Sequence, residues 1–294
     1  MKISLGIFAY NEEKNVAKLL GAVLGQKLNK VELEEIIVVA SGCTDKTVEI
    51  SRGFSAKDGR VRVLVQEKRE GKFSAINLFL KTAKNEILAI ESADTLPSED
   101  VLERLIKPFE DSLVGMAGAR PMPTNNESGF WGFASHFLWE LHHQLSLAEP
   151  KMGELVAFRK IFDKIPPTAV DEAVIEAIIS SAGFKVVYVP DAIVYNKGPE
   201  SLFDFLKQRR RIFCGHLALR KQLGHKVSTM DWQKIFALIF KNLKPSIRFL
   251  AFVSLIVLLE ALARFLGWLD YCLGRNHYIW QNIESAKNPA VVIK

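Results

Sequence analysis

NEILAIESADTLP, residues 85–97, is the stretch that indicates the fold most clearly. Its apolar run at residues 87–90 is too short for a helix and too apolar for a surface loop, so we expect a buried central strand that ends at Glu91. Ligands of open α/β sheets bind outside the carboxyl ends of the strands, where Glu91, Ser92 and Asp94 lie here. Oxygen atoms clustered there suit a divalent cation that carries a diphosphate, although Asp94 by itself would also suit a plain turn.

Strands and helices alternate along the chain on both sides of this stretch. The spacing of apolar residues predicts strands at residues 3–9, 35–40 and 61–66, and helices at residues 11–24, 44–54, 71–84 and 101–109. Because crossovers between parallel strands are right-handed, this order places helices on both faces of one sheet. We therefore expect an α/β fold with a doubly wound, mostly parallel sheet.

An apolar helical appendage is expected to follow this α/β domain. Residues 246–269 contain only three charged side chains and are long enough to cross a bilayer. Glu260 and Arg264 stand four residues apart, so they could pair inside a membrane or mark a helix that lies in its interface. An amphipathic helix is predicted just before, at residues 232–243. We divide the chain into a main domain (1–227), interfacial and membrane-inserted helices (228–273) and a C-terminal tail (274–294).

Charge and cysteine usage bear on the location of the protein. The formal net charge of +6 suits an anionic lipid surface or phosphorylated substrates, and no nucleic-acid-binding module accompanies it. The apolar run at the N-terminus is too short for a signal peptide, and the three cysteines form no CxxC pair, so we expect neither a disulfide framework nor a zinc site. Lys241 and Lys244 precede the apolar segment, which favours a main domain on the cytoplasmic face of a membrane.

Two turns near the N-terminus carry polar groups where a nucleotide could bind. Residues 10–13, Tyr-Asn-Glu-Glu, follow the first strand, and residues 41–45 follow the second, where Ser41 or Thr44 would cap the next helix. Either turn could serve only as a cap. The chain has no GxGxxG sequence and no Walker loop, which removes the main support for a dinucleotide-binding or P-loop protein.

Six motifs, in order, resemble those of the family 2 glycosyltransferases. AYNEE (9–13), VVASGCTDKT (38–47), GKFSAIN (71–77) and IESADT (90–95) are similar to the family's PxYNEE, VVDDGSTDGT, GKxxALN and DADT. GELVAFR (153–159) is similar to GxxxAFR, and QRRRI (208–212) is similar to QxxRW, a motif of membrane-associated members. The resemblance covers residues 2–219 and implies a nucleotide-diphospho-sugar transferase fold, which is Rossmann-like and binds a nucleoside diphosphate sugar with a divalent metal.

The resemblance also implies roles for individual residues. The donor would be bound by Ala9, Tyr10, Asn11, Glu12, Ser41, Lys72, Ser92, Asp94, Gln208 and Arg211. Mn²⁺ or Mg²⁺ would be held by Asp94, with Glu91 as a second candidate ligand, and Gly153 and Glu154 would face the acceptor. Asp171 and Glu172 stand where the family has its acidic catalytic pair.

The chain departs from the family pattern at four places, one of which is the inverted order of the acidic pair, Asp171-Glu172. Ala40 and Ser41 replace two aspartates that usually help to bind the base, which leaves the nucleotide open. Only Asp94 remains of the outer acids in the DxD-like motif. Ile212 replaces the tryptophan of QxxRW, so the stacking platform of processive synthases is missing, and transfer of one sugar is favoured over polymerisation.

The acidic pair opens a predicted helix, which bears on its chemistry. Both first-turn acids lie near the positive end of the helix dipole, so we expect them to stay ionised, as a base must. They point about 100° apart around the axis, so only one can face the reaction. Counting back from Gly183 places Glu172 at the family's base position and Asp171 at the preceding structural acid.

These observations predict an inverting glycosyltransferase that acts on a lipid-linked or glycan acceptor at a membrane. Two alternatives stay open: a catalytically degenerate sugar-nucleotide-binding membrane protein, because acids are missing at Ala40 and Ser92, and a nucleotidyltransferase on a similar sheet. His142 and His143 lie in an almost wholly apolar predicted helix at residues 129–147 without HExxH spacing, so we expect a structural or membrane-contacting helix there rather than a metal site.

Overall fold

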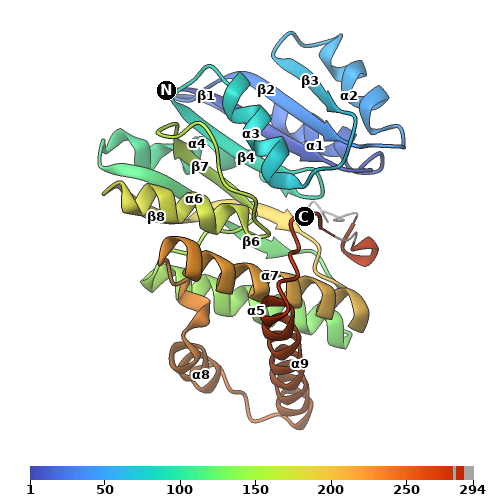
Figure 1. Ribbon diagram of the computed structural model, residues 1–294, viewed down its shortest axis with the longest axis vertical. Helices are drawn as coiled ribbons and strands as arrows, with labels where there is room; N and C mark the ends of the chain where they lie inside the picture. The colour runs from blue at the N-terminus through green and yellow to red at the C-terminus, as the bar shows by residue number, and fades with distance from the viewer. Residues whose placement is uncertain (281–282, 288–294) are drawn as a thin grey trace.

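The computed structural model describes residues 1–280 and 283–287, and within them eight strands form one sheet (Figure 1). The order of the strands is β3-β2-β1-β4-β7-β6-β8-β5. Their bounds are β1 (Lys2–Ala9), β2 (Glu32–Ser41), β3 (Val61–Gln66), β4 (Ile87–Ser92), β5 (Leu96–Pro97), β6 (Val114–Pro123), β7 (Leu155–Arg159) and β8 (Lys185–Asn196). β4 lies between β1 and β7 and is buried from Ile87 to Glu91, which confirms the predicted central strand.

Most strand pairs are parallel, as predicted. Four of the seven pairs in the described residues are parallel, namely β1–β2, β1–β4, β2–β3 and β6–β8. β7 runs antiparallel to both of its neighbours, with Arg159 opposite Ile87 and Leu155 opposite Glu91. Because β7 begins where β4 ends, the residues just before it, including Glu154, lie at the same edge of the sheet as Asp94.

Helices cover both faces of the sheet and bury an apolar core on each. On one face, α1 (Val16–Leu24) and α4 (Val101–Ile106) pack on alternate residues of β1, β2 and β4, and α2 (Thr47–Ser55) lies beside α1. On the other face, α3 (Lys72–Thr82) and α6 (Asp171–Ser181) pack around Phe79 and Phe158. A 3₁₀ turn, η1 (Lys107–Glu110), follows α4. Strands β1, β2, β4, β6 and β7 therefore have buried apolar side chains on both faces of this doubly wound sheet.

Helices α1 and α2 begin later than predicted, and a polar turn explains the difference. Asn11 has a φ of 53°, which a helix cannot contain. Its side-chain oxygen accepts a hydrogen bond from the Thr44 N–H at 2.8 Å, which holds both turns outside the helices. The cap expected from Ser41 or Thr44 is wrong, because Asp45 accepts the Thr47 N–H at 3.0 Å instead.

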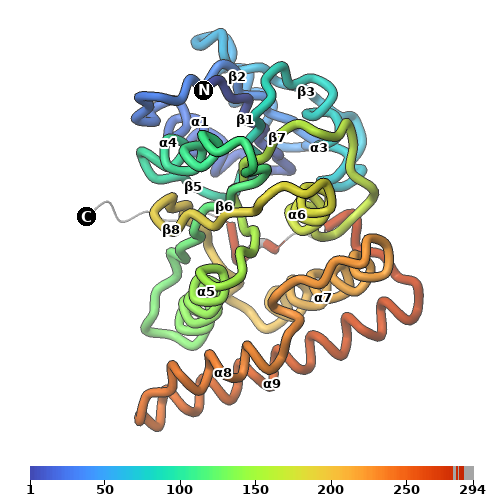
Figure 2. Tube along the Cα trace, turned by 90° about the vertical axis from the view of Figure 1, so that its left-hand side faces the viewer, coloured from blue at the N-terminus to red at the C-terminus, as the bar shows by residue number. Residues whose placement is uncertain are grey.

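A further layer of helices lies beyond the carboxyl ends of the central strands (Figures 1 and 2). It consists of α5 (Phe130–Ala148), α7 (Leu202–Leu223), the 3₁₀ turn η2 (Ser228–Met230), α8 (Trp232–Lys241) and α9 (Ile247–Cys272). α9 runs along α7 in Figure 2, and ion pairs join the two helices, from Arg209 to Glu260 and from Arg210 to Asp270. α9 is the one described helix that is long and apolar enough to cross a membrane, as judged by length and composition.

The chain returns from α9 to the sheet. Tyr278 packs edge-on against Phe73 at the start of α3, with 6.2 Å between ring centroids. A short 3₁₀ turn, η3 (Glu284–Ala286), follows, and the description ends at Lys287. Residues 281–282 and 288–294 of the predicted tail lie outside the described residues.

Candidate active site

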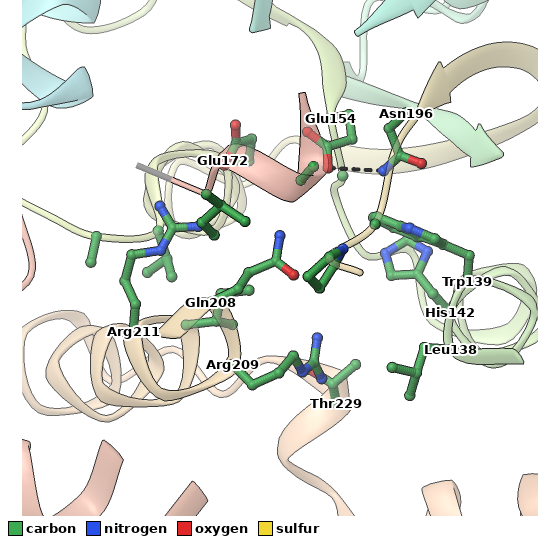
Figure 3. Close-up of a pocket in the computed structure, with 18 of the residues that line it drawn as sticks. Leu138, Trp139, His142, Glu154, Glu172, Asn196, Gln208, Arg209, Arg211 and Thr229 are labelled. Atoms are coloured by element: carbon green, nitrogen blue, oxygen red, sulfur yellow. Dashed lines mark hydrogen bonds between the residues drawn. The ribbon is translucent and has the colours of Figure 1, made fainter. Parts of the chain in front are cut away.

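A cavity of about 550 Å³ opens at the carboxyl ends of β1 and β4 and extends between α5 and α7 (Figure 3). The predicted site residues that line it are Ala9, Tyr10, Glu12, Ser41, Lys72, Ser92, Asp94, Gly153, Glu154, Glu172, Gln208 and Arg211. They come from distant parts of the sequence and meet because the parallel strands β1, β2 and β4 all end at this edge of the sheet. Asn11, Glu91 and Asp171 are predicted site residues that do not line it.

Asn11 has a structural role instead. Its side-chain oxygen accepts a hydrogen bond from the Thr44 N–H. Its side-chain NH₂ group donates a hydrogen bond to the Thr44 hydroxyl at 3.2 Å. The backbone N–H of Glu12 donates to the Thr47 hydroxyl at 2.7 Å. These contacts tie the turn after β1 to the start of α2, and so fix the positions of Tyr10 and Glu12 at the cavity wall.

The carboxyl groups of Glu12, Asp94 and Glu154 make the part of the cavity next to the sheet acidic. Burial, and next the charge of Asp94, raise the pKa of Glu154 to about 7. Burial and the same neighbour also raise the pKa of Glu12. Glu154 accepts a hydrogen bond from the side-chain amide of Asn196 at 3.1 Å (Figure 3). Because Asp94 repels both of the other carboxyl groups, a cation bound beside Asp94 would be favoured.

The donor set fits a divalent cation that is shared with a ligand. Among the described residues, no three His, Cys, Asp or Glu side chains form a preformed metal site. Mg²⁺ is commonly held by one or two carboxylates together with phosphate oxygens of a substrate, and Mn²⁺ also accepts oxygen ligands. Asp94, which lines the cavity beside Glu154 and Glu12, is the carboxylate that fits this arrangement.

Glu91 is separated from the cavity. It is 1% exposed, and its carboxylate accepts a hydrogen bond from the Thr95 hydroxyl at 2.9 Å. Burial raises its pKa to about 8. A carboxyl group that holds a proton at neutral pH and does not reach the cavity is a poor metal ligand, so we do not include Glu91 in the cation site.

Asp171 and Glu172 open α6, and their environments differ. The Asp171 carboxylate is fully buried, and neither oxygen has a hydrogen-bond partner among the described residues. Burial raises its pKa to about 7, so the helix dipole does not keep Asp171 firmly ionised as we expected. Glu172 lines the cavity, on the same side as Arg211 (Figure 3). Of the two acids, Glu172 is therefore the one that a ligand can reach.

Lys72 is the partner of Glu172. Its Nζ lies 2.6 Å from Glu172 Oε1, at the start of α3. Burial alone would lower the pKa of Lys72, but the charges of Glu172 and Asp171 outweigh it and raise that pKa. Gly71 precedes it with a φ of 101°, and a Cβ there would stand 2.4 Å from the backbone oxygen of Tyr278. The glycine therefore lets the C-terminal segment approach the backbone beside Lys72.

Arg211 projects from α7 into the cavity on the same side as Glu172 (Figure 3). Its Nε and Nη1 groups are buried without a hydrogen-bond partner among the described residues. Burial lowers its pKa to about 10, although the charges of the nearby carboxylates raise it. Arg211 is therefore still a cation at neutral pH. A planar cation with two unpaired N–H groups suits phosphate oxygens.

The C-terminal segment supplies contacts that the sequence did not indicate. The Trp280 ring lies under the Arg211 guanidinium, 3.6 Å from Cζ to the ring centroid, and Lys72 Nζ lies 5.2 Å from the same ring. Lys287 Nζ lies 2.7 Å from Glu12 Oε1. These residues are far along the chain from their partners and belong to no local motif, so only the folded structure reveals them.

The comparisons with known proteins agree with this architecture. The family model "Glycosyl transferase family 2" matches residues 4–176, more than half of the chain. The glycosyltransferase AglE of Haloferax volcanii is 32% identical over 116 residues, which cover 40% of this chain and 38% of that protein. The match thus spans well under half the length of this relative.

Two solved structures have a similar fold. The mannosyltransferase PcManGT from Pyrobaculum calidifontis, in complex with GDP-Man and Mn²⁺, has a TM-score of 0.69 at 19% identity and covers 93% of this chain and 88% of its own. Glucosyl-3-phosphoglycerate synthase from Mycobacterium tuberculosis, with Mg²⁺ and UDP, has a TM-score of 0.56 at 17% identity and covers 76% of this chain and 79% of its own. Because the family model matches residues 4–176, more than half of the chain, we conclude that the chain belongs to glycosyl transferase family 2.

Proposed function

We propose that this protein is an inverting glycosyltransferase that moves one sugar from a nucleoside diphosphate sugar to a lipid-linked or glycan acceptor at a membrane. The observation that carries the proposal is that one cavity contains a carboxylate that can act as a base, Glu172, and two cations that can bind a diphosphate, Lys72 and Arg211. A non-catalytic nucleotide-binding protein would need the cations but has no need of the reachable carboxylate.

The diphosphate of the donor would lie between Arg211, Lys72 and Asp94. The unpaired Nε and Nη1 groups of Arg211 would donate hydrogen bonds to its oxygens. A divalent cation, Mn²⁺ or Mg²⁺, held by Asp94 and the diphosphate would offset the negative charge of the leaving group. The nucleoside would extend toward Tyr10 and Ser41, at the ends of β1 and β2.

Glu172 would act as the general base. The acceptor hydroxyl oxygen attacks the anomeric carbon of the donor sugar while Glu172 takes its proton. The bond between the anomeric carbon and the diphosphate oxygen breaks, and the nucleoside diphosphate leaves with the electron pair, which inverts the configuration. Lys72, whose Nζ lies 2.6 Å from Glu172, would turn toward the diphosphate and leave the carboxylate free to accept the proton.

The membrane contact would be made by α8 and α9. Both helices carry large exposed apolar side chains, among them Phe240 (69% exposed) and Ile247 (90% exposed). A spanning α9 would draw Arg209 and Arg210 of α7 into the bilayer with their partners Glu260 and Asp270, which is costly. We therefore propose that α8 and α9 lie in the membrane interface, with the catalytic domain on the cytoplasmic side.

Manganese-dependent release of nucleoside diphosphate tests the proposal. Purified full-length protein is incubated with GDP-mannose or UDP-glucose, with and without Mn²⁺ and with water as the acceptor, and the release of GDP or UDP is measured. We expect release from at least one donor that depends on Mn²⁺ and falls about a hundredfold or more in Asp94→Asn. Asp191→Asn, which removes an exposed carboxylate, is the matched control and is expected to act as wild type. Release that is the same in Asp94→Asn would remove Asp94 from the cation site.

A further inference from the structure

The cavity continues past the donor side into a second space, which we call the inner chamber. It is lined by Lys151, by Arg209 of α7 and by Arg264 of α9, with His142 of α5 and His216 of α7. In Figure 3 it extends from Gln208 down to Arg209 and Thr229, and His142 and Leu138 line its α5 side. None of these basic side chains has a role in the transfer step described above.

Positive charge exceeds negative charge in the inner chamber. Glu260 pairs with both Arg209 and Arg264, so one carboxylate serves two guanidinium groups. Lys151 Nζ has no carboxylate oxygen within 4.0 Å among the described residues, and the nearby Glu176 pairs with His225 at 3.2 Å. Burial, and next the charge of Arg209, lower the pKa of Lys151 to about 8. The Lys151 ammonium group is therefore still mostly protonated at neutral pH, although Arg209 repels it. A bound anion would relieve this repulsion.

An unpaired buried nitrogen is a second, independent indication of a ligand. The His142 side chain is 7% exposed, and its Nε2 has no hydrogen-bond partner among the described residues. Burial lowers the pKa of His142 and of His216 well below the ordinary value, so both rings are neutral and add no charge of their own. A neutral ring with one open nitrogen can donate to an anion oxygen, whereas a dry apolar ligand would leave that nitrogen unsatisfied.

The remaining walls of the chamber are apolar and lead toward the α8–α9 surface. They are formed by Leu138 of α5, by Ile235, Phe236 and Ile239 of α8, and by Ile256 and Val257 of α9. Phe236 is 42% exposed, so this wall is continuous with the exposed apolar face of α8. A ligand with an anionic group at the basic residues could therefore extend a hydrocarbon chain along α8 to the membrane interface.

We propose that the inner chamber binds the phosphate group of a lipid phosphate, an ester of phosphoric acid with a long-chain alcohol, as part of the glycosyl acceptor. Lys151, Arg209 and Arg264 hold the phosphate, His142 donates a hydrogen bond to it, and the hydrocarbon chain lies between α5, α8 and α9. This inference rests on the proposed function and specifies its acceptor. The reacting hydroxyl belongs to a sugar carried by this phosphate and lies on the side that faces Glu172, so the phosphate ester itself is neither formed nor broken.

Binding of three probes to the full-length protein tests this inference without any turnover. Dodecyl phosphate, dodecanol and inorganic phosphate are titrated by calorimetry, each below its aggregation limit. Dodecyl phosphate is expected to bind at least tenfold more tightly than either of the other two, because it alone satisfies both the basic and the apolar parts of the chamber. Equal affinity for dodecyl phosphate and dodecanol would overturn the phosphate site. Equal affinity for dodecyl phosphate and inorganic phosphate would overturn the lipid part.

Variants of Lys151 locate the phosphate. Lys151→Gln is expected to weaken dodecyl phosphate binding about tenfold or more and to leave dodecanol binding unchanged, since one charge-assisted hydrogen bond is lost. Lys151→Arg is expected to restore most of the affinity. The control is Lys221→Gln, an exposed lysine at the end of α7, which is expected to bind as wild type. Wild-type affinity in Lys151→Gln would overturn the assignment.

The two proposals can fail separately. Mn²⁺-dependent release of nucleoside diphosphate without any preference for dodecyl phosphate would contradict the inner-chamber inference alone. Tight, Lys151-dependent binding of dodecyl phosphate without any release of nucleoside diphosphate from the donors would contradict the catalytic proposal and leave a lipid-phosphate-binding protein.

Discussion

The indole ring of Trp280 lies against the guanidinium group of Arg211, with 3.6 Å between Arg211 Cζ and the ring centroid. The same C-terminal segment places Lys287 2.7 Å from Glu12. A cation and an acid on the donor side of the cavity thus each have a partner from the end of the chain. Stacking on an aromatic face leaves the edge N–H groups of a guanidinium open, so Arg211 is held flat with its donors still unpaired.

Trp280→Ala is expected to weaken the binding of a nucleoside diphosphate about threefold to tenfold. The variant removes a cation–π contact of about 1 kcal/mol that holds the Arg211 guanidinium flat with its edge N–H groups open to a diphosphate. The measurement is the dissociation constant of GDP and of UDP with Mn²⁺, determined by calorimetry. Trp268→Ala, on the exposed face of α9, is the control and is expected to leave affinity unchanged. Unchanged or tighter binding in Trp280→Ala would mean that the ring does not position Arg211 for the diphosphate.

Gly71→Ala is expected to destabilise the protein by about 1–3 kcal/mol. The backbone at Gly71 is in a region that favours glycine, and the added Cβ would stand 2.4 Å from the Tyr278 oxygen. Gly21→Ala is a sharp control, because nothing lies within 4 Å of a Cβ at this position of α1. It is expected to stabilise the helix by up to about 1 kcal/mol. Urea unfolding measures both, and equal effects would contradict the close approach of the C-terminal segment.

Glu91→Gln is expected to reduce the dependence of stability on pH. Burial raises the Glu91 pKa from 4.5 to about 8, so between these values the unfolded chain loses a proton that the folded protein keeps. This contribution is fully present below pH 4.5 and is lost as the pH rises to about 8, at up to about 1.4 kcal/mol for each pH unit. The gain in the free energy of unfolding of Glu91→Gln over wild type should therefore increase from pH 5 to pH 8.

Urea unfolding at several pH values between 5 and 8 provides this comparison. Glu154 and Asp171, whose pKa values are also raised by burial, remain in the variant, so some pH dependence persists. Glu99→Gln changes an exposed carboxylate and serves as the control, with no expected trend. A constant difference between Glu91→Gln and wild type at all pH values would show that Glu91 is ionised in the folded protein.

Serine substitutions at Phe240 and Ile247 are expected to lower membrane binding by at least tenfold. Each removes a large exposed apolar side chain whose burial in lipid contributes about 1.5–3 kcal/mol. Sedimentation with vesicles of phosphatidylcholine and phosphatidylglycerol measures the bound fraction. Phe203→Ser on α7, 77% exposed, is the matched control. Alkaline carbonate should release the wild type from membranes if α9 lies in the interface, and retention in the pellet would indicate a spanning helix.

Much of the fold could be predicted because its signals are local. The apolar run at residues 87–90 and the strand at residues 61–66 are short and bounded by polar residues, and both are found as predicted. The motifs after β1, β2 and β4 gather in one cavity because parallel strands present their carboxyl ends at one edge. The predicted start of α1 was wrong because the conformation of Asn11 depends on its hydrogen bond with Thr44, which is 33 residues away in the sequence.

The rest of the site depends on contacts between distant residues. Trp280 and Lys287 reach the donor side only because α9 lies along α7 and returns the chain to the sheet. Whether Glu91 or Asp171 faces the cavity is decided by a shift of a single residue along a strand or along a helix. The inner chamber is likewise formed by residues of five segments, α5, α7, α8, α9 and the stretch that holds Lys151, which lie far apart in the sequence.

The assignment of Glu172 as the base is tested most directly by comparing two isosteric variants in one assay. Mn²⁺-dependent release of nucleoside diphosphate from GDP-mannose or UDP-glucose, and the affinity for the same donor, are measured for Glu172→Gln and Asp171→Asn. We predict that Glu172→Gln releases product about a hundredfold or more slowly than wild type and binds the donor within a few-fold of wild-type affinity. Release near the wild-type rate in Glu172→Gln, together with its loss in Asp171→Asn, would contradict the account and assign the base to Asp171.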